Sequence, residues 1–187
     1  PPYCSLPDVF PLSCSRGFTV YTGFFEGRRV SVVSIGMGFP MVDFFVREAR
    51  AIVKGPMNII RLGSCGSPKE GVTVGSVVAS KYAVGIYADT RPYSIRKLTG
   101  SQFTITDPTK PDPKLHNALM KTLKVASKTF PLLEAGNASA DYFYGSQGRL
   151  DDAFPDENTN LLKDLMDKYP DTSALEMESY LLFNLAD

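Results

Sequence analysis

The sequence is poor in histidine and cysteine and has no excess of positive charge. It contains one histidine and three cysteines in 187 residues. Cys4, Cys14 and Cys65 are odd in number and show neither C-x-x-C spacing nor a neighbouring histidine, so we expect no disulfide framework and no metal. Lysine plus arginine equals aspartate plus glutamate, at 20 each. Binding of nucleic acid through bulk charge is therefore not expected.

Long apolar runs are also missing. No run approaches the ~20 residues that span a bilayer, and residues 1–4 show neither the charged nor the apolar region of a signal peptide. Together with the cysteine pattern, this predicts a cytoplasmic protein with no membrane partner. The length suits one domain, which at this size buries roughly 70% of the surface exposed by its unfolded chain.

The sequence does contain alternating strand and helix patterns. Residues 30–35 are β-branched and nearly all apolar, which predicts a strand covered on both faces. After Pro40, apolar residues recur three and four apart, so a helix with Pro40 in its first turn is expected. Residues 57–62 predict a second buried strand. The three segments would form a right-handed βαβ unit.

Further elements follow from the same patterns. Strands are expected at residues 77–80, 83–87 and 102–105, and helices at 113–127, at 158–168 and from about residue 176. Residues 90–113 are rich in Pro, Thr, Lys and Asp without clear periodicity, so they are expected to form a surface excursion. The pattern indicates the α/β class.

A glycine loop, Gly36-Met37-Gly38, lies between the first predicted strand and helix. A dinucleotide fingerprint would need a third glycine where Met41 stands, and an acidic residue at the end of the following strand, so we reject that interpretation. Backbone amides at the start of a helix can still bind an anion. A tight turn without a ligand fits the residues equally well.

Arg61 interrupts an apolar strand pattern, where a buried guanidinium is costly unless an anion or a carboxylate meets it. Ser64 and two glycines follow, so a hydroxyl and accessible amides accompany the arginine, an arrangement that favours phosphate. The alternative is an ion pair with a core carboxylate such as Glu48 or Glu178.

Cys65 follows Ser64, but the sequence suggests no partner that would activate it. The only histidine, His116, falls within a predicted surface helix, so no Cys/His pair is expected. We interpret Cys65 as a small packing residue.

The order of these motifs resembles the nucleoside phosphorylase family, which includes uridine phosphorylases and hexameric purine nucleoside phosphorylases. Residues 34–40, followed by Glu48, resemble the family signature, although Met41 stands where a serine is usual and Ala49 where a leucine is usual. The resemblance covers nearly the whole chain. It implies an α/β fold in a single domain over residues 1–187, with a mixed central sheet flanked by helices in three layers.

The resemblance assigns phosphate binding to the two glycine loops, including Gly36 and Gly63. Arg61 would grip the phosphate, and the Ser64 hydroxyl would contact phosphate or ribose. Arg16 resembles the arginine that family members lend across a subunit interface, which implies a homodimer or hexamer. A solvated arginine is the alternative for Arg16.

Residues 176–179, Glu-Met-Glu-Ser, resemble the ribose motif of the family. Glu178 would accept hydrogen bonds from the 2′ and 3′ hydroxyls, Met177 would pack beneath the sugar, and Glu176 would also belong to the substrate site. Two carboxylates around an apolar side chain can offer an acceptor beside an apolar floor. On composition alone, an acidic first helical turn is the alternative.

Residues 143–149 resemble the segment with which uridine phosphorylases hold uracil. Gln147 and Arg149 would hydrogen-bond the edge of the base, and Phe143 would pack on its ring. Uracil presents acceptor O2, donor N3–H and acceptor O4, which an amide and a guanidinium match. Purine-specific relatives lack this pair. Without the family context, a polar surface turn would be favoured.

The resemblance implies phosphorolysis of uridine to uracil and ribose 1-phosphate, a pentosyl transfer of pyrimidine salvage that needs phosphate but no cofactor. Arg61, Ser64, Glu178 and Arg149 would be the catalytic residues. The alternatives are a purine nucleoside phosphorylase or nucleosidase of the same fold, or a catalytically silent nucleoside-binding relative. Family members usually carry a further N-terminal phosphate loop and a C-terminal lid, which this sequence does not show.

Overall fold

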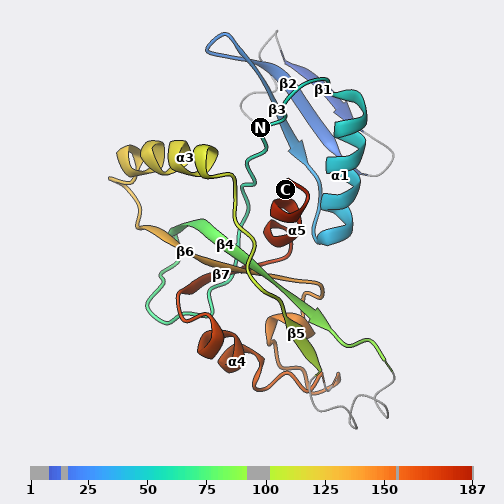
Figure 1. Ribbon diagram of the computed structural model, residues 1–187, viewed down its shortest axis with the longest axis vertical. Helices are drawn as coiled ribbons and strands as arrows, with labels where there is room; N and C mark the ends of the chain where they lie inside the picture. The colour runs from blue at the N-terminus through green and yellow to red at the C-terminus, as the bar shows by residue number, and fades with distance from the viewer. Residues whose placement is uncertain (1–8, 14–16, 92–101, 155, 187) are drawn as a thin grey trace. The chain divides into compact units, whose positions relative to one another are not determined.

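The computed structural model describes residues 9–13, 17–91, 102–154 and 156–186, and these fall into two compact units. The first unit ends at Met37 and the second begins at Gly38. Each unit is described separately below (Figure 1). The predicted single domain over residues 1–187 stays a prediction.

The first unit is a three-stranded antiparallel sheet of β1 (Phe10–Ser13), β2 (Thr19–Phe25) and β3 (Arg28–Ser34). Two residues, Glu26 and Gly27, connect β2 to β3 with φ angles of 49° and 74°. Two left-handed residues in succession are typical of the tight turn that matches the twist of a hairpin.

The predicted strand at residues 30–35 is confirmed in β3, but its expected burial on both faces is wrong. Val30 and Val32 are 44% and 65% exposed. Within the described residues, β3 pairs with β2 alone and lies at the edge of an antiparallel sheet. A β-branched apolar run is therefore compatible with a hairpin strand as well as with a buried parallel strand.

The second unit contains a mixed four-stranded sheet in the order β5-β4-β6-β7. β4 (Val77–Ala88) pairs in parallel with β6 (Leu132–Ala140), which pairs in parallel with β7 (Thr172–Glu176). β5 (Phe103–Ile105) is antiparallel to β4. β6 is thus bordered by a parallel strand on each side.

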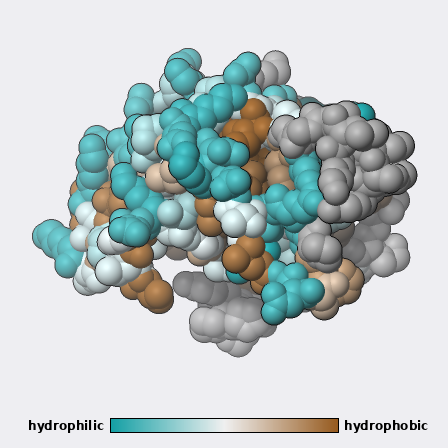
Figure 2. Space-filling view, turned by 90° about the horizontal axis from the view of Figure 1, so that it is seen from below, coloured by the Kyte–Doolittle hydropathy of each residue, from teal (hydrophilic) through white to brown (hydrophobic). Residues whose placement is uncertain are grey.

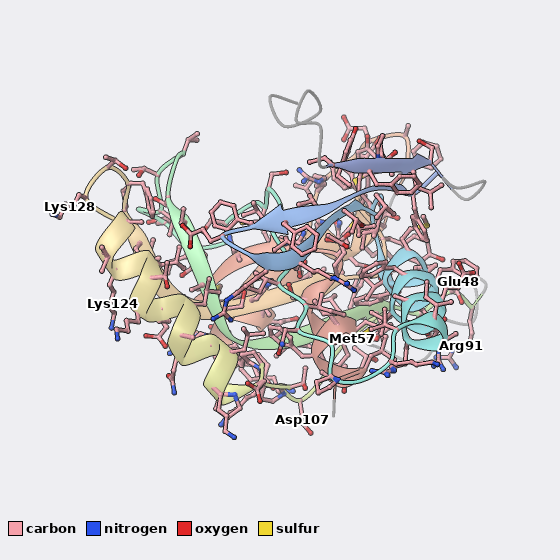
Figure 3. All side chains as sticks on the ribbon, turned by 90° about the horizontal axis from the view of Figure 1, so that it is seen from above. Glu48, Met57, Arg91, Asp107, Lys124 and Lys128 are labelled. Atoms are coloured by element: carbon pink, nitrogen blue, oxygen red, sulfur yellow. The ribbon has the colours of Figure 1, made fainter. Side chains whose placement is uncertain are left out.

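The helices of this unit are α1 (Phe39–Ile52), α3 (Pro113–Ala126), α4 (Leu161–Lys168) and α5 (Ser179–Asn184), with a 3₁₀ turn, η1, at Gly145–Gln147. Pro40 lies in the first turn of α1, as predicted. Asp112 caps α3, where its side chain accepts the N–H of Leu115 at 2.7 Å. Lys124 and Lys128, near the end of α3, point away from the sheet in Figure 3.

Side chains along β6 alternate between the two faces of the sheet. Ala138 and Ala140 are fully buried in a core that includes Leu161 and Leu165 of α4. Ser139, between the two alanines, instead accepts a hydrogen bond from the backbone of α5. α4 and α5 therefore cover opposite faces, so this unit has three layers (Figure 1). The predicted α/β class, with a mixed sheet flanked by helices, is confirmed.

The second predicted strand, at residues 57–62, is wrong. Residues 53–65 form neither helix nor strand, and Ile60 and Leu62 are 57% and 96% exposed. Pairing begins at Gly66, which exchanges two backbone hydrogen bonds with Leu175 at 2.8 and 2.9 Å. An apolar run becomes a strand only where a neighbouring strand supplies ladder partners, so the expected βαβ unit is wrong as well.

Other boundaries differ less. The predicted strands at 77–80 and 83–87 are one strand, β4, with a register shift between Ser80 and Tyr82. The predicted strand at 102–105 and the helices at 113–127, 158–168 and 176 onward correspond to β5, α3, α4 and α5. Of the predicted excursion at 90–113, residues 92–101 lie outside the described residues.

Among the described residues, none of the helices has the length and apolar character of a membrane span. The surface seen from below carries hydrophilic areas interspersed with smaller hydrophobic ones (Figure 2).

Candidate functional site

The candidate site lies where the parallel strands β6 and β7 end. β6 ends at Ala140 and β7 at Glu176, so both carboxyl ends reach the same edge of the sheet. Ligands of open α/β sheets bind at this edge, where the segments that follow the strands converge. The predicted residues follow both strands: residues 141–149 continue from β6, and Met177 and Glu178 continue from β7.

Glu176 is a buried carboxylate, 4% exposed, that organises the turn after β7. Its oxygens accept the N–H of Glu178 at 2.9 Å, the N–H of Ser179 at 3.1 and 3.2 Å, and the hydroxyl of Ser139. Burial raises the pKa of the Glu176 carboxyl, while Arg61 and Ser139 act in the opposite direction. Glu176 thus holds the next carboxylate, Glu178, in place.

Arg61 spans both carboxylates. Its Nη2 donates to Glu178 Oε2 at 2.5 Å, and its Nε lies 3.1 Å from Glu176 Oε2. The Arg61 side chain is 22% exposed. The alternative to a phosphate ligand, an ion pair between Arg61 and a core carboxylate, is present, and its partner is Glu178. Glu48 lies on α1 (Figure 3). No hydrogen bond from Nη1 is found in the described part of the chain, so Arg61 keeps donors for an anion.

The start of α1 meets the second oxygen of Glu178. The backbone N–H of Gly38 donates to Glu178 Oε1 at 2.6 Å. Gly38 has a φ of 95°, a conformation that favours glycine, and a Cβ there would lie 3.8 Å from Met177 Cε. The second unit therefore brings Gly38, Arg61 and the predicted ribose motif into one cluster.

Three aromatic rings fix the helices that carry this cluster. Phe39 of α1 lies 5.4 Å from Tyr87 of β4 and 6.3 Å from Tyr180 of α5, measured between ring centroids. Tyr87 and Tyr180 are 6.3 Å apart, edge to face. Phe39 is adjacent to Gly38 in the chain, and Tyr180 lies two residues after Glu178. The packing of these rings therefore helps to hold the donor and the acceptor of the Gly38–Glu178 hydrogen bond together.

The other predicted phosphate residues are placed less directly. A Cβ at Gly63 would lie 2.9 Å from Arg61 Nη2, so glycine leaves room for the guanidinium. Ser64 is exposed. Gly36, with a φ of 78°, belongs to the first unit. Arg16 lies outside the described residues.

Cys65 is exposed, so its prediction as a packing residue is wrong. The pKa of its thiol is raised, first by desolvation, with Arg61 acting in the opposite direction. A raised pKa favours the protonated thiol, which is a poor nucleophile.

The residues predicted to bind the base form a second cluster after β6. The Arg149 guanidinium carbon lies 4.4 Å from the centre of the Phe143 ring, and its Nε donates to the Phe143 carbonyl at 3.1 Å. Arg149 Nη2 also donates to Gln147 Oε1 at 3.2 Å. Gln147 is 5% exposed, within η1, whereas Arg149 is exposed. An amide, a guanidinium and an aromatic ring thus lie together.

Two residues that the sequence did not indicate, Asp141 and Asn158, anchor the segment that follows β6. Asp141 accepts the N–H of Ala88 at 2.9 Å and the hydroxyl of Ser146. Asn158 donates to the Gly145 and Arg149 carbonyls. Asp141 could have been noted because it directly follows a strand, but β6 itself was not predicted.

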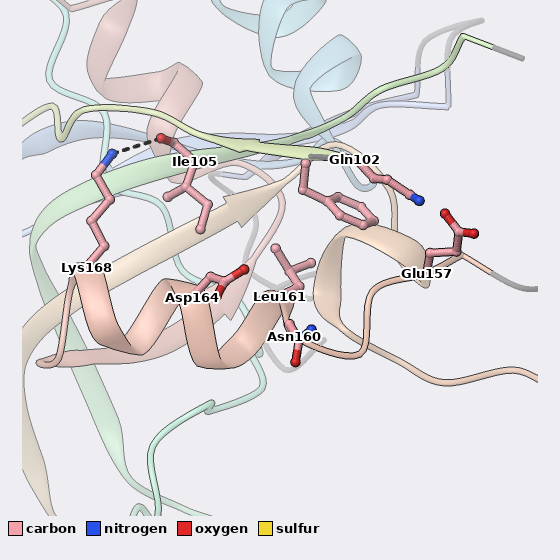
Figure 4. Close-up of a pocket in the computed structure, with 8 residues that line it drawn as sticks. Gln102, Ile105, Glu157, Asn160, Leu161, Asp164 and Lys168 are labelled. Carbon is pink, nitrogen blue, oxygen red and sulfur yellow. Dashed lines mark hydrogen bonds between the residues drawn. The ribbon is translucent and has the colours of Figure 1, made fainter. Parts of the chain in front are cut away.

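A pocket of about 340 Å³ lies between β5 and α4 (Figure 4). It is lined by Gln102, Phe103, Ile105, Glu157, Asn160, Leu161, Asp164 and Lys168. Lys168 donates to the Ile105 carbonyl at 3.1 Å. None of the predicted site residues lines this pocket, so it is separate from the two clusters.

No group of three or more His, Cys, Asp or Glu side chains that could hold a metal ion occurs among the described residues.

Comparison with known proteins identifies relatives along nearly the whole chain. Residues 3–187 match the family described as the Phosphorylase superfamily. The uridine phosphorylase of Thermococcus kodakarensis is 29% identical over 174 residues, covering 92% of this chain and 57% of that protein. The purine nucleoside phosphorylase DeoD-type 1 of Vibrio cholerae is 31% identical over 175 residues, covering 91% of this chain and 61% of that protein.

A solved structure shows the same fold. It comes from a structural and catalytic analysis of two diverse uridine phosphorylases in the oomycete Phytophthora capsici. Its TM-score is 0.88 at 33% identity, covering 97% of this chain and 67% of that chain. This chain spans 57% and 61% of the length of the two curated relatives above. The extent of the family match and the likeness of the fold show that the chain belongs to the phosphorylase superfamily, with nucleoside phosphorylases as its relatives.

Proposed function

We propose that the protein to which this chain belongs catalyses the phosphorolysis of uridine, giving uracil and ribose 1-phosphate. The observation that carries the proposal is the cluster of Gln147, Arg149 and Phe143 at the same sheet edge as Arg61 and Glu178. The first cluster matches the hydrogen-bonding edge and the ring of uracil, and the second offers a cation for phosphate and a carboxylate for ribose hydroxyls.

The proposed reaction moves the ribosyl group from uracil nitrogen to a phosphate oxygen. Phosphate attacks the anomeric carbon while the glycosidic bond breaks, and the electron pair of that bond leaves with uracil. Arg61 and the Ser64 hydroxyl orient the phosphate and offset its charge. Neither a metal nor an organic cofactor is required, because phosphate is the second substrate.

Glu178 and Arg149 act on opposite sides of the bond that breaks. The negative charge of Glu178 favours the positive charge that develops on the ribose. Gln147 and Arg149 stabilise the negative charge that grows on departing uracil. The exposure of Arg149 leaves its guanidinium accessible to a substrate.

The charge of the Arg61 cluster supports a contribution from a second subunit. Arg61 already faces two carboxylates, Glu176 and Glu178. A phosphate would therefore add negative charge to a cluster in which the described residues supply one cation. We propose that Arg16 of a neighbouring copy supplies the further positive charge, which makes the active form a homodimer or a larger oligomer. Pyrimidine salvage and a cytoplasmic location belong to the same proposal.

The assay that tests the function measures uracil release from uridine by the intact protein, with and without phosphate. Uracil release that requires phosphate is expected. Uracil release without phosphate would indicate a hydrolase and would contradict the proposal. Thymidine and deoxyuridine, assayed in parallel, measure how far turnover depends on the 2′ hydroxyl and on the C5 position of the base.

A purine substrate is the second candidate, because curated purine nucleoside phosphorylases are similar to this chain at 31% identity. Inosine with phosphate distinguishes the two, since hypoxanthine release without uracil release would favour the purine reaction. Binding of uridine by calorimetry without any base release would instead indicate a catalytically silent relative.

The Arg149→Ala variant distinguishes two roles of Arg149: binding of uracil, and stabilisation of uracil as the leaving group. If Arg149 stabilises charge on the leaving uracil, the change lowers kcat by about 100-fold as well as raising KM for uridine. Steady-state kinetics with saturating phosphate measure both constants. An unchanged kcat would exclude the role in leaving-group activation.

A further inference from the structure

Residues 141–149 carry the base-binding cluster and have little regular structure of their own. Their internal backbone–backbone hydrogen bonds are long: Gln147 N and Arg149 N both donate to the Tyr144 carbonyl at 3.2 Å, and Gly148 N donates to the Gly145 carbonyl at 3.2 Å. A single 3₁₀ turn is weakly stable by itself. The position of Gln147 therefore depends on anchors outside the turn.

Asn158 is the anchor that spans this turn. It lies before α4, eleven positions beyond Gln147, and is 4% exposed. Its Nδ2 donates to the Gly145 carbonyl at 2.9 Å and to the Arg149 carbonyl at 2.8 Å. An amide nitrogen has two protons, and both are used here.

The two carbonyls flank Gln147 on either side. Because one nitrogen binds both, it fixes the distance between the residue that begins η1 and the residue that carries the guanidinium. The Asp141–Ser146 hydrogen bond fixes the same turn to the end of β4. Asn158 is the described residue whose side chain contacts the backbone on both sides of Gln147.

We propose that Asn158 is a positioning residue for recognition of the base, which sets the spacing of the Gln147 amide and the Arg149 guanidinium. The inference rests on the proposed function for its substrate, and it deepens that proposal. Asn158 acts through the two residues and does not itself contact the substrate.

Asn160 offers a matched control. It is the same residue type two positions away, it is exposed, and its side chain makes no hydrogen bond that caps α4. Figure 4 shows it at the start of that helix. Asn160→Ala therefore reports the cost of removing an asparagine from this segment without removing the contacts to Gly145 and Arg149.

The first measurement compares steady-state kinetics of Asn158→Ala and Asn160→Ala in the intact protein. Asn158→Ala is expected to lower kcat/KM for uridine by about 10- to 100-fold, because small displacements of groups that position a substrate cost this much. KM for phosphate should change less than about 2-fold, because the Arg61 cluster is untouched. Asn160→Ala is expected to match the wild type. Equal behaviour of the two variants would overturn the inference.

The second measurement is a double-mutant cycle with Gln147→Ala. A residue that acts only through Gln147 and Arg149 loses most of its effect once Gln147 is removed. The Gln147→Ala/Asn158→Ala variant is therefore expected to have a kcat/KM within about 3-fold of Gln147→Ala alone. Fully multiplicative losses would show that Asn158 acts elsewhere.

Hydrogen exchange separates failure of this inference from failure of the proposed function. The amides of residues 145–149 should exchange faster in Asn158→Ala than in Asn160→Ala, whichever base the enzyme releases. If the wild type releases only hypoxanthine, the proposed function fails while exchange still reports the anchor. If uridine is the substrate and exchange is unchanged, the inference fails. Should Asn158→Ala not fold, Asn158→Ser keeps one donor and is measured in its place.

Discussion

Arg61 is the described residue whose positive charge faces both buried carboxylates, Glu176 and Glu178. Its guanidinium lies 2.5 Å from Glu178 and 3.1 Å from Glu176, and the Glu178 side chain is 7% exposed. Removing one partner of a buried ion pair leaves the other charge without compensation, which costs more than the pair itself contributes. The same guanidinium is therefore expected to stabilise the fold whether or not a ligand binds to it.

Arg61→Met tests this dependence without reference to the reaction. The change keeps an apolar stem of similar length but leaves both carboxylates buried, so the free energy of unfolding should fall by about 3 kcal/mol. Glu178→Gln should cost only about 1 kcal/mol, because Arg61 keeps Glu176 as a partner. Urea unfolding of both variants gives the values. If Arg61→Met were the milder change, the charge argument would be wrong.

A charged residue within an apolar strand pattern can be identified from the sequence, whereas an ordinary polar residue that holds a distant backbone segment cannot. A buried guanidinium is costly unless an anion or a carboxylate meets it, so the sequence itself indicates a role for Arg61. The resemblance indicates Glu178. Ser139 and Asn158 are ordinary polar residues whose role depends on the backbone atoms they meet in three dimensions. No local pattern marks such a residue, because its partners come from distant segments.

At Gly148, both the backbone conformation and the packing favour glycine. Its φ is +69°, and a Cβ there would lie 2.7 Å from Leu162 Cγ on α4. Gly148→Ala should therefore lower the free energy of unfolding by about 2–4 kcal/mol, from strain and overpacking together. Gly75, with φ +91° and nothing near its Cβ position, is the control for strain alone. Gly75→Ala should lower the free energy of unfolding by about 1 kcal/mol. If urea unfolding gave the same loss for both variants, the contact with Leu162 would not contribute to the cost of Gly148→Ala.

At the scale of elements, prediction succeeded where a segment carries its own signal and failed where the neighbours decide. α1 and α3 were predicted because apolar periodicity and a proline in the first turn are local features. β6 was missed because its sequence, LLEAGNASA, is rich in residues with low strand propensity. Small residues suit that central position, since a Cβ at Gly136 would lie 2.4 Å from the Tyr82 side chain.

Tyr82 connects β4 to the start of β7 across β6, because its hydroxyl donates to Asp171. Burial, and then this hydrogen bond, raise the pKa of Tyr82 to about 12. The folded state therefore binds more protons than the unfolded state between pH 10 and about 12, so stability is retained below pH 10 and lost as pH rises through that window.

An absorbance titration of tyrosinate should show a step near pH 12 in the folded protein, to which Tyr82 contributes. Tyr82→Phe should reduce that step and flatten the loss of stability with alkaline pH. If the variant keeps the whole high-pH step, another tyrosine is responsible and the assignment to Tyr82 is wrong.

At the scale of the whole molecule, the class was predictable and the sheet order was not. Alternating strand and helix signals indicate an α/β fold. The order β5-β4-β6-β7 requires parallel pairing between segments about 50 residues apart, such as Val78 with Leu133, and no local signal specifies such pairs. The chain also spans 57% of its Thermococcus kodakarensis relative, so assembly is tested on the intact protein.

The proposed donation of Arg16 between subunits predicts complementation. Arg16→Ala and Glu178→Gln should each be nearly inactive alone, because each site would lack either the lent arginine or the ribose carboxylate. In a randomly mixed assembly, a site is complete when its own chain carries Glu178 and its donor carries Arg16. About one quarter of the sites then meet both conditions.

Co-expression of the two variants, followed by the uracil-release assay, measures the recovery. About one quarter of wild-type activity is expected if each site takes its arginine from a neighbour. If Arg16 served its own chain, every chain in the mixture would still carry one defect and activity would stay at the level of the single variants. An active Arg16→Ala variant would show instead that Arg16 is a solvated residue, and the charge of the phosphate would then have to be balanced within one chain.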